Sequence, residues 1–351
     1  MTRLISYAEA LREAQDYCLG AHPECFLMGL GVPDPKGIFG STIGLQDKYG
    51  PDRVFDVPLS ENAMTGVALG SAISGMRPVL THQRVDFALS SIEQLVNQAA
   101  KWHYMFGGRM KAPMVIRMVI GRGWGQGPQH SQSLHGWFAH IPGLKVILPT
   151  TPFDAKGMLI SAVEDDNPVI CFEHRWLYNL EDHVPSADYR VPLGQARVLR
   201  EGTDVTLVGV SYMTLECLQA AELLKEFGVS AEVVDLRCVR PLDLDRILSS
   251  VEATGRVLSV DVGHIFGGFS GEISAAVSEN LFSQLKVPAA RVGSPDYPTP
   301  TSPGLSNDYY PLHYTVAARC MEMLDRPSAL VGVSVDRTPR DQPDSSFTGP
   351  F

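Results

Sequence analysis

Residues 57–87 read VPLSENAMTGVALGSAISGMRPVLTHQRVDF, and this stretch decides the fold class. It begins where a short β-rich run ends at Pro58, which cannot donate to a strand ladder. Ser60 is a good N-cap, so the pattern predicts a helix over residues 62–74 and places Glu61 at the corner between strand and helix. In an open α/β sheet the ligand crevice lies outside the carboxyl ends of the strands. A carboxylate at this corner is therefore well placed for chemistry.

The Glu61 carboxylate also has a purely structural interpretation. An acid in the first turn of a helix interacts favourably with the helix dipole, by roughly 0.3–1 kcal/mol. Taken alone, the stretch favours this interpretation over catalysis.

The predicted helix is rich in small residues. Gly66 and Gly70 lie inside it, and a glycine there costs about 1 kcal/mol relative to alanine. Such a cost indicates the close approach of another backbone. Tight packing within one domain and contact with another subunit explain the pattern equally well.

The composition describes an ordinary globular protein. With 351 residues the chain is long enough for about two domains, and 44% hydrophobic and 19% charged residues permit a sizeable core. The net charge of −10, without a basic cluster, argues against a nucleic-acid or anionic-membrane partner. No run reaches the about 18 apolar residues of a membrane span.

The N-terminal residues and the cysteines indicate a cytoplasmic protein. Residues 1–17 lack the apolar core of a signal peptide. The six cysteines show no CxxC spacing. We expect them to be buried, reduced thiols rather than disulfide or zinc ligands.

The order of predicted elements indicates an α/β fold. A capping box at Ser6 and Glu9 starts a helix, which we expect to be the first element. Strands are predicted at residues 25–28, 79–81, 113–120, 144–148 and 169–172, with helices over residues 87–102 and 154–163. This alternation predicts a mostly parallel sheet with helices on both faces.

The pattern restarts after residue 190, which predicts a second α/β domain. Strands are expected at residues 205–210, 231–236, 257–260 and 290–292, and helices over residues 213–227, 242–251, 271–281 and 314–324. We therefore place domains at residues 1–190 and 191–328, with residues 179–202 as a crossing segment. The polar tail, residues 329–351, is expected to be disordered or to act as a docking arm.

A glycine-rich loop follows the strand at residues 113–120. It reads GRGWGQGPQHSQS over residues 121–133, and its backbone N–H groups can approach an anion or a ligand closely. It can equally be a mobile surface loop. His130 directly after the glycines favours a site, although a single histidine is more often a structural residue. The glycines lack the GxGxxG spacing and the ribose-binding acid of a nicotinamide-dependent dehydrogenase, which excludes that class.

Several motifs in series resemble one family. They are PLSE (58–61), GMRPV (75–79), VDFALSSIEQLVNQAAK (85–101), QHSQS (129–133) and HIPGLKVILPTTPFDAKG (140–157). Together they resemble the β subunit of the thiamine-diphosphate-dependent 2-oxoacid dehydrogenase E1 component, of the pyruvate and branched-chain types. The resemblance implies a thiamine-diphosphate-binding fold, in which a pyrimidine-binding domain precedes a transketolase C-terminal-like α/β domain.

The resemblance implies roles for individual residues. Glu61 matches the catalytic glutamate that hydrogen-bonds N1′ of the aminopyrimidine ring and promotes removal of the thiazolium C2 proton. Leu59, Gln83 and Phe87 match the ring pocket. His130 matches the active-site histidine, a residue type whose pKa near neutrality suits proton transfer. Related β subunits hold a structural potassium ion with backbone carbonyls at the positions of Met114, Ala162, Asp165 and Asn167.

A missing motif implies a partner chain. Family members that hold the whole cofactor carry a GDG motif followed by an NN pair, which bind magnesium and the diphosphate. This sequence has no GDG. The resemblance therefore implies an α subunit in an α2β2 assembly, with magnesium held mainly by that subunit. It also implies oxidative decarboxylation of a 2-oxo acid, acyl transfer to a lipoyl-bearing dihydrolipoyl acyltransferase, and no activity of this chain alone.

Arg84 departs from the family pattern, because relatives place an uncharged or aromatic residue there. One interpretation is an ion pair with a nearby acid such as Asp86. The other is recognition of an anionic or polar group on an unusual substrate or acceptor.

Two other functions fit the same sequence. Half of a split transketolase, or a specialised acyl-transferring synthase, would use the same cofactor with another acceptor. A non-catalytic assembly subunit would keep the fold, but the presence of both Glu61 and His130 argues against it.

Overall fold

Helix α1 (Tyr7–Ala21) begins at the capping box that the sequence predicts. The Ser6 hydroxyl accepts a hydrogen bond from the Glu9 backbone N–H at 3.2 Å, and the Glu9 carboxylate accepts one from the Ser6 N–H at 2.8 Å. The expectation that this helix comes first is wrong. Strand β1 (Thr2–Ser6) precedes it and pairs antiparallel with β8 (Glu181–Pro185).

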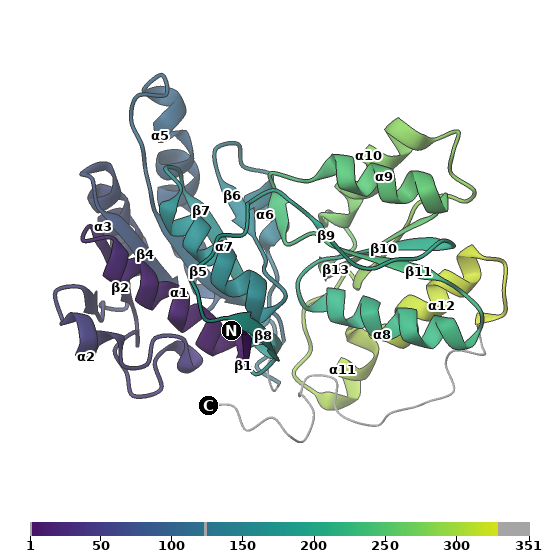
Figure 1. Cartoon of the computed structure of the whole chain (residues 1–351), viewed down its shortest axis with the longest axis horizontal. Helices are drawn as coiled ribbons and strands as arrows, with labels where there is room; N and C mark the ends of the chain where they lie inside the picture. The colour runs from purple at the N-terminus through teal and green to yellow at the C-terminus, as the bar shows by residue number, and fades with distance from the viewer. Residues whose placement is uncertain (1, 123–124, 329–351) are drawn as a thin grey trace. The chain divides into compact units, whose positions relative to one another are not determined.

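The protein, here a computed structural model, is described over residues 2–122 and 125–328, which form two units (Figure 1). Residues 2–120 and 137–193 form the first unit, and residues 121–136 and 194–328 form the second. This division differs from the expected domains, residues 1–190 and 191–328, at residues 121–136 and 191–193, and the expected domains stay a prediction. The expected tail lies outside the described residues. None of the described helices is long and apolar enough to cross a membrane.

The first unit contains a sheet of parallel strands. They are β2 (Cys25–Gly29), β3 (Val54–Phe55), β4 (Arg77–His82), β5 (Val115–Ile120), β6 (Lys145–Ile147) and β7 (Val169–His174). They lie in the order β6-β7-β5-β4-β2-β3. Strands β2, β5 and β7 are buried along their whole length, which explains why their sequences are mainly apolar. The exceptions are Arg117 in β5 and Glu173 and His174 in β7.

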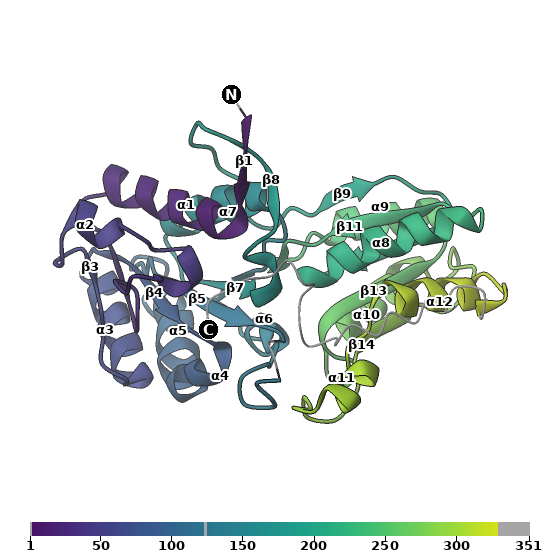
Figure 2. The same ribbon diagram turned by 90° about the horizontal axis from the view of Figure 1, so that it is seen from below.

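Helices cover both faces of this sheet. Helix α1 packs beside α7 (Pro152–Glu164), whereas α3 (Glu61–Ile73) lies on the opposite face against β4 (Figure 2). The predicted mostly parallel sheet between two helical layers is thereby confirmed. The shorter helical segments are Ile38–Gly40, α2 (Leu45–Tyr49), α4 (Val85–Ala88), Leu89–Ser91, the π-helical Gln94–Ala99, α5 (Ala100–Met105), α6 (His135–Ala139) and Arg175–Leu177.

The two glycines inside α3 are not explained by packing within the unit. A Cβ atom added at Gly70 would meet no described atom within 4 Å, and one at Gly66 would meet only the side chain of Gln94, at 3.5 Å. Tight packing within one domain is therefore the wrong explanation. Contact with another subunit stays a prediction.

The second unit repeats the architecture. Its sheet comprises β9 (Arg197–Arg200), β10 (Val205–Gly209), β11 (Ala231–Asp235), β13 (Val257–His264) and β14 (Ala290–Ser294). These strands lie in the order β14-β13-β10-β11-β9, and only β9 runs antiparallel to its neighbour. Its remaining elements are α8 (Tyr212–Glu226), β12 (Cys238–Arg240), α9 (Leu244–Thr254), α10 (Ser270–Leu281), α11 (Pro303–Tyr309) and α12 (His313–Met323). Figure 1 shows α8 and α12 on one face of the sheet and α9 and α10 on the other.

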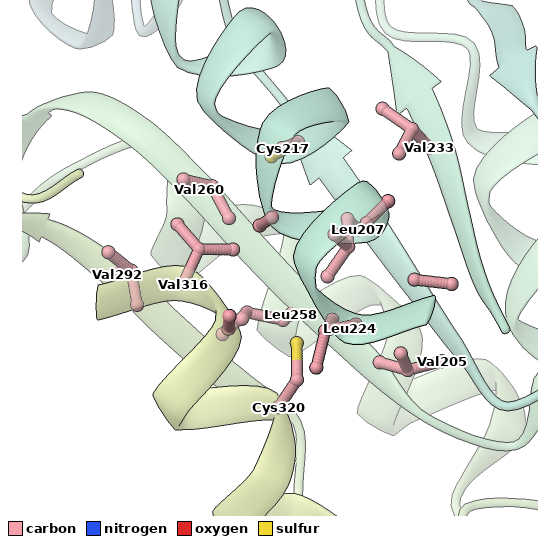
Figure 3. Close-up of a cluster of buried hydrophobic side chains, with 14 of the residues drawn as sticks. Val205, Leu207, Cys217, Leu224, Val233, Leu258, Val260, Val292, Val316 and Cys320 are labelled. Atoms are coloured by element: carbon pink, nitrogen blue, oxygen red, sulfur yellow. The ribbon is translucent and has the colours of Figure 1, made fainter. Parts of the chain in front are cut away.

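Two of the cysteines lie in the core of this second unit. Cys217 on α8 and Cys320 on α12 face the buried side chains of β10 and β13, such as Leu207 and Leu258 (Figure 3). All six cysteines are free and buried, as predicted. Burial raises the pKa of the Cys320 thiol to about 12, so the thiol stays protonated and unreactive at neutral pH.

The segment at residues 179–202 is not a simple crossing segment. Its first part forms β8, which completes the two-stranded sheet with β1, and its second part forms β9 of the second sheet. Short strands and the seven-residue α11 were missed because they carry too few residues for a periodic pattern.

A buried ion pair joins the centre of the first sheet to the helix and loop above it. The Arg117 guanidinium on β5 donates to both carboxylate oxygens of Glu173 on β7, at 2.6 and 2.8 Å. It also donates to Gln15 Oε1 on α1 at 2.8 Å and to Ser41 Oγ at 2.9 Å. Tyr178 donates a further hydrogen bond to Glu173. Both charged side chains are fully buried, so each depends on the other.

We predict that Glu173→Ala lowers the free energy of unfolding by about 3–5 kcal/mol, because it leaves the Arg117 charge buried without its counter-ion. Urea denaturation of the purified variant measures this change. The double variant Arg117→Met/Glu173→Leu removes both charges and should lose less. A Glu173→Ala variant as stable as the wild type would contradict the assigned pair.

Candidate active site

A pocket in the first unit opens at the carboxyl ends of β2 and β4. It encloses about 350 Å³, including open solvent at its mouth. The lining residues are Leu30, Val57, Pro58, Leu59, Glu61, Met64, Leu80, Thr81, His82, Gln83 and Phe87. This is the sheet edge at which parallel α/β folds bind ligands.

Glu61 is the first residue of α3 and lies half-buried in this pocket. Within residues 2–122 and 125–328, its carboxylate has no hydrogen-bond or ion-pair partner. The unpaired N–H groups of the first helical turn favour a negative charge at this position. The carboxylate is therefore held in the pocket and remains available to a ligand.

The other three residues expected in the ring pocket line it as well. Gln83 donates its side-chain amide to the Leu30 carbonyl at 3.1 Å, which ties the end of β4 to the loop after β2. Phe87 is half-buried, and Leu59 has 75% of its surface exposed. The structure thus brings Leu59, Gln83 and Phe87 together with Glu61, while their contacts with a ligand stay predictions.

His82 also lines the pocket and was missed from the sequence. It ends β4, is 5% exposed, and its Nε2 atom lies 3.2 Å from Thr65 Oγ1. Burial lowers the pKa of His82 to about 4, so the ring is neutral at physiological pH. The run RPVLTH offered a signal, because a strand ending at His82 points to the edge where Glu61 lies.

His130 lies in the second unit, where it is half-buried. Its backbone N–H donates to the Gly127 carbonyl at 3.3 Å. Gly127 has φ +74°, and a Cβ atom there would lie 2.6 Å from Thr301 Oγ1, so this turn requires glycine. The loop beside His130 therefore packs against Thr301 of the second unit.

A buried pair anchors the far end of the same segment. The Nε2 atom of His135 lies 2.9 Å from Asp261 Oδ1, and both side chains are 1% exposed. The Asp261 carboxylate also accepts the N–H groups of Gly263 at 3.0 Å and Ser270 at 3.3 Å. Burial alone would raise the pKa of Asp261, but His135 and these two amides outweigh burial and lower it. This pair explains why residues 121–136 belong to the second unit.

Three of the four carbonyls predicted to hold potassium, those of Met114, Ala162 and Asp165, already accept hydrogen bonds. The Met114 carbonyl accepts the Val169 N–H at 3.0 Å. The Arg77 guanidinium donates to the carbonyls of Val163 at 2.8 Å and Asp165 at 2.9 Å. The Ala162 carbonyl accepts the Asp165 N–H at 3.4 Å, and the Asn167 N–H donates to the Asp165 carboxylate at 2.9 Å. The Arg77 guanidinium thus occupies part of this region. The binding of a potassium ion stays a prediction.

Arg84 is buried, with 5% of its surface exposed, at the N-terminal end of α4. A second buried cation, Arg175, lies close enough to feel its charge. Burial lowers the pKa of Arg175 to about 10, Tyr178 opposes this shift, and Arg84 adds to it. Both interpretations of Arg84 stay predictions.

Two family models match the chain. The transketolase pyrimidine-binding domain matches residues 3–181, which include the whole pocket, and the transketolase C-terminal domain matches residues 194–313. A solved structure described as a split-gene transketolase, an inactive β4 tetramer, has the same fold, with a TM-score of 0.74 and 24% identity. It covers 92% of this chain and 98% of its own. Fold and pocket together define a two-domain protein of the transketolase type.

Curated relatives narrow this class. The β subunit of acetoin:2,6-dichlorophenolindophenol oxidoreductase from Cupriavidus necator is 42% identical, over 91% of this chain and 97% of its own length. The β subunit of mitochondrial pyruvate dehydrogenase E1 from Dictyostelium discoideum is 39% identical, over 87% of each chain. The 2-oxoisovalerate dehydrogenase β subunit of Bacillus subtilis is 40% identical, over 84% of this chain and 90% of its own. The chain belongs to the family of β subunits of thiamine-diphosphate-dependent 2-oxoacid dehydrogenase E1 components, which work with an α subunit.

We predict that Asp261→Asn destabilises the protein by about 1–3 kcal/mol at pH 7, because it removes a buried, hydrogen-bonded charge. A lowered folded-state pKa stabilises the fold above the unfolded pKa of about 3.9, and this contribution is lost as the pH falls through the folded value. The difference between variant and wild type should therefore shrink below about pH 4.

Chemical denaturation at a series of pH values measures this difference. The exposed Asp296, changed to Asn, is a matched control in the same unit and should show almost none. An Asp261→Asn penalty that grows toward acid pH would contradict the assigned charge state.

Proposed function

We propose that this chain is the β half of a heteromeric enzyme that uses thiamine diphosphate to decarboxylate a 2-oxo acid oxidatively and to pass the acyl group to a lipoyl group. The observation that carries the proposal is the Glu61 carboxylate, which lies in a pocket without a protein partner. Membership of the E1 β family supports the same chemistry.

The pocket residues fit the aminopyrimidine half of the cofactor. Apolar side chains such as Met64 and Leu80 and the aromatic ring of Phe87 suit a flat heterocycle, and Glu61 supplies the one carboxylate of the lining. The cofactor, when bound, supplies an electron sink for the loss of carbon dioxide. Glu61 would share a proton with ring nitrogen N1′, and the apolar part of the lining would strengthen that hydrogen bond by excluding water.

His130 is proposed as the acid–base group that acts on the substrate. The support is its residue type, its half-buried position beside a turn that requires glycine, and its match to the family motif QHSQS. The segment that carries it is anchored through His135 and Asp261 in the second unit.

The chain is proposed to act in an α2β2 assembly. The sequence has no GDG motif for the diphosphate, so the α subunit is the proposed holder of that group and of most of the magnesium site. The open face of α3, with Gly70 and the half-exposed Val67, is the proposed contact with another subunit. A lipoyl-bearing acyltransferase is the proposed acceptor of the acyl group. A potassium ion near Asp165 is proposed from the resemblance alone.

Acetoin is a second candidate substrate. It is favoured by the 42% identity to a β subunit whose name states an acetoin oxidoreductase. Pyruvate, branched-chain 2-oxo acids and acetoin, assayed side by side with an artificial electron acceptor, separate the two candidates.

We predict that Glu61→Gln, produced together with the α subunit, lowers kcat by about 100-fold or more. The amide cannot hold the shared proton, whereas the assembly should be unchanged because Glu61 makes no hydrogen bond or ion pair within the described chain. Steady-state kinetics of the purified complex and size-exclusion chromatography measure both properties. Wild-type turnover in this variant would contradict the proposal and favour an assembly subunit.

A further inference from the structure

His82 lies in the wall of the pocket, and one of its ring nitrogens has no hydrogen-bond partner among the described residues. His82 ends β4, on the side of the sheet covered by α3, and lines the pocket with only 5% of its surface exposed. A role for His82 in binding rests on the proposed use of thiamine diphosphate by this chain.

The two ring nitrogens of His82 have different surroundings. Nε2 lies 3.2 Å from the hydroxyl of Thr65, which is fully buried on α3 one turn after Glu61. Nδ1 has no hydrogen-bond partner among the described residues. It is not one of the fully buried polar atoms of the described chain. Nδ1 therefore keeps some exposed surface, and because His82 lines the pocket we infer that Nδ1 faces it.

The neutral ring makes Nδ1 a defined hydrogen-bonding group. In neutral imidazole one nitrogen donates and the other accepts, and the partner of one nitrogen selects the tautomer. The Thr65 hydroxyl can donate to Nε2 or accept from it, and either arrangement leaves Nδ1 with one role. A neutral polar atom on an otherwise buried ring suits an uncharged heterocycle better than an anion.

We propose that His82 is a further cofactor-binding residue, which offers Nδ1 to a polar atom of the aminopyrimidine ring while Thr65 fixes Nε2. Because Thr65 and Glu61 are on adjacent turns of α3, the same hydrogen bond links His82 to the helix that carries Glu61. His82 thereby orients the ring for its contact with Glu61.

Substitutions separate the two nitrogens. Asparagine places a polar atom near Nδ1, glutamine places one near Nε2, and leucine places none. In the complex with the α subunit and magnesium, we expect His82→Leu and His82→Gln to bind thiamine diphosphate about five- to tenfold more weakly than the wild type, and His82→Asn to stay within about twofold. Isothermal titration calorimetry measures binding, and thermal melting with size-exclusion chromatography verifies folding and assembly.

Cofactor analogues test whether the contact is direct. In one analogue ring nitrogen N3′ is replaced by carbon, and in the other the 4′-amino group is removed. One of the two should bind equally to the wild type and to His82→Leu, because it lacks the atom that Nδ1 contacts. If His82→Leu weakens the cofactor and both analogues equally, the residue only packs, and the inference is overturned.

The other outcomes also decide the question. Tighter binding by His82→Gln than by His82→Asn, or unchanged binding by all three variants, would overturn the role of Nδ1. If the wild-type complex does not bind thiamine diphosphate, or Glu61→Gln keeps full turnover, the proposed function itself fails. If Glu61→Gln loses turnover while the His82 variants bind normally, only the inference about His82 fails.

Discussion

The chemistry proposed for this protein depends on one carboxylate that the fold holds in a pocket without giving it a partner. Glu61 begins α3, where the unpaired amides of the first turn favour its charge. Among the residues that the structure describes, no cation or donor pairs with it. Buried charges elsewhere in the first unit, such as Arg117 and Glu173, are paired by several hydrogen bonds. This contrast supports the proposal that the half-buried Glu61 carboxylate takes its partner from outside the chain.

Hydrogen bonds connect the segments around Glu61 to one another. The amide of Gln83 ties the end of β4 to the loop after β2, and the ring of His82 ties it to α3 through Thr65. These hydrogen bonds connect the three segments that form the pocket. A flat ring bound there would therefore meet walls already in place, which reduces the ordering cost of binding.

Sequence patterns of a few consecutive residues correctly predicted several helices and strands. The Ser6–Glu9 capping box and the buried runs of β5 and β7 are sequence signals of a few consecutive residues, and the structure confirms them. Strand β1 was missed because its partner, β8, lies about 180 residues away and its own sequence is mostly polar and exposed. The assignment of residues 121–136 to the second unit depends on His135 meeting Asp261, a contact between distant positions that no local pattern reveals.

In the candidate site, too, some features could be read from the local sequence and others only from the folded chain. Glu61 was identifiable because a strand, a proline and a serine typical of helix N-caps are adjacent in sequence, although the Ser60 side chain makes no cap hydrogen bond in the structure. The family motif then suggested its role. The run RPVLTH offered a signal for the position of His82, but its neutral state follows from burial against α3, which only the folded chain shows. Likewise, the hydrogen bonds from Arg77 to backbone carbonyls near Asp165 arise from residues almost 90 positions apart.

The most direct test of the central claim is a structure of this chain assembled with its α subunit, magnesium and thiamine diphosphate. We predict a Glu61 carboxylate oxygen at hydrogen-bond distance, about 2.6–3.0 Å, from pyrimidine nitrogen N1′, with the diphosphate bound by the other polypeptide. A Glu61 side chain turned to bulk solvent, or a complete cofactor site within a single copy of this chain, would contradict it.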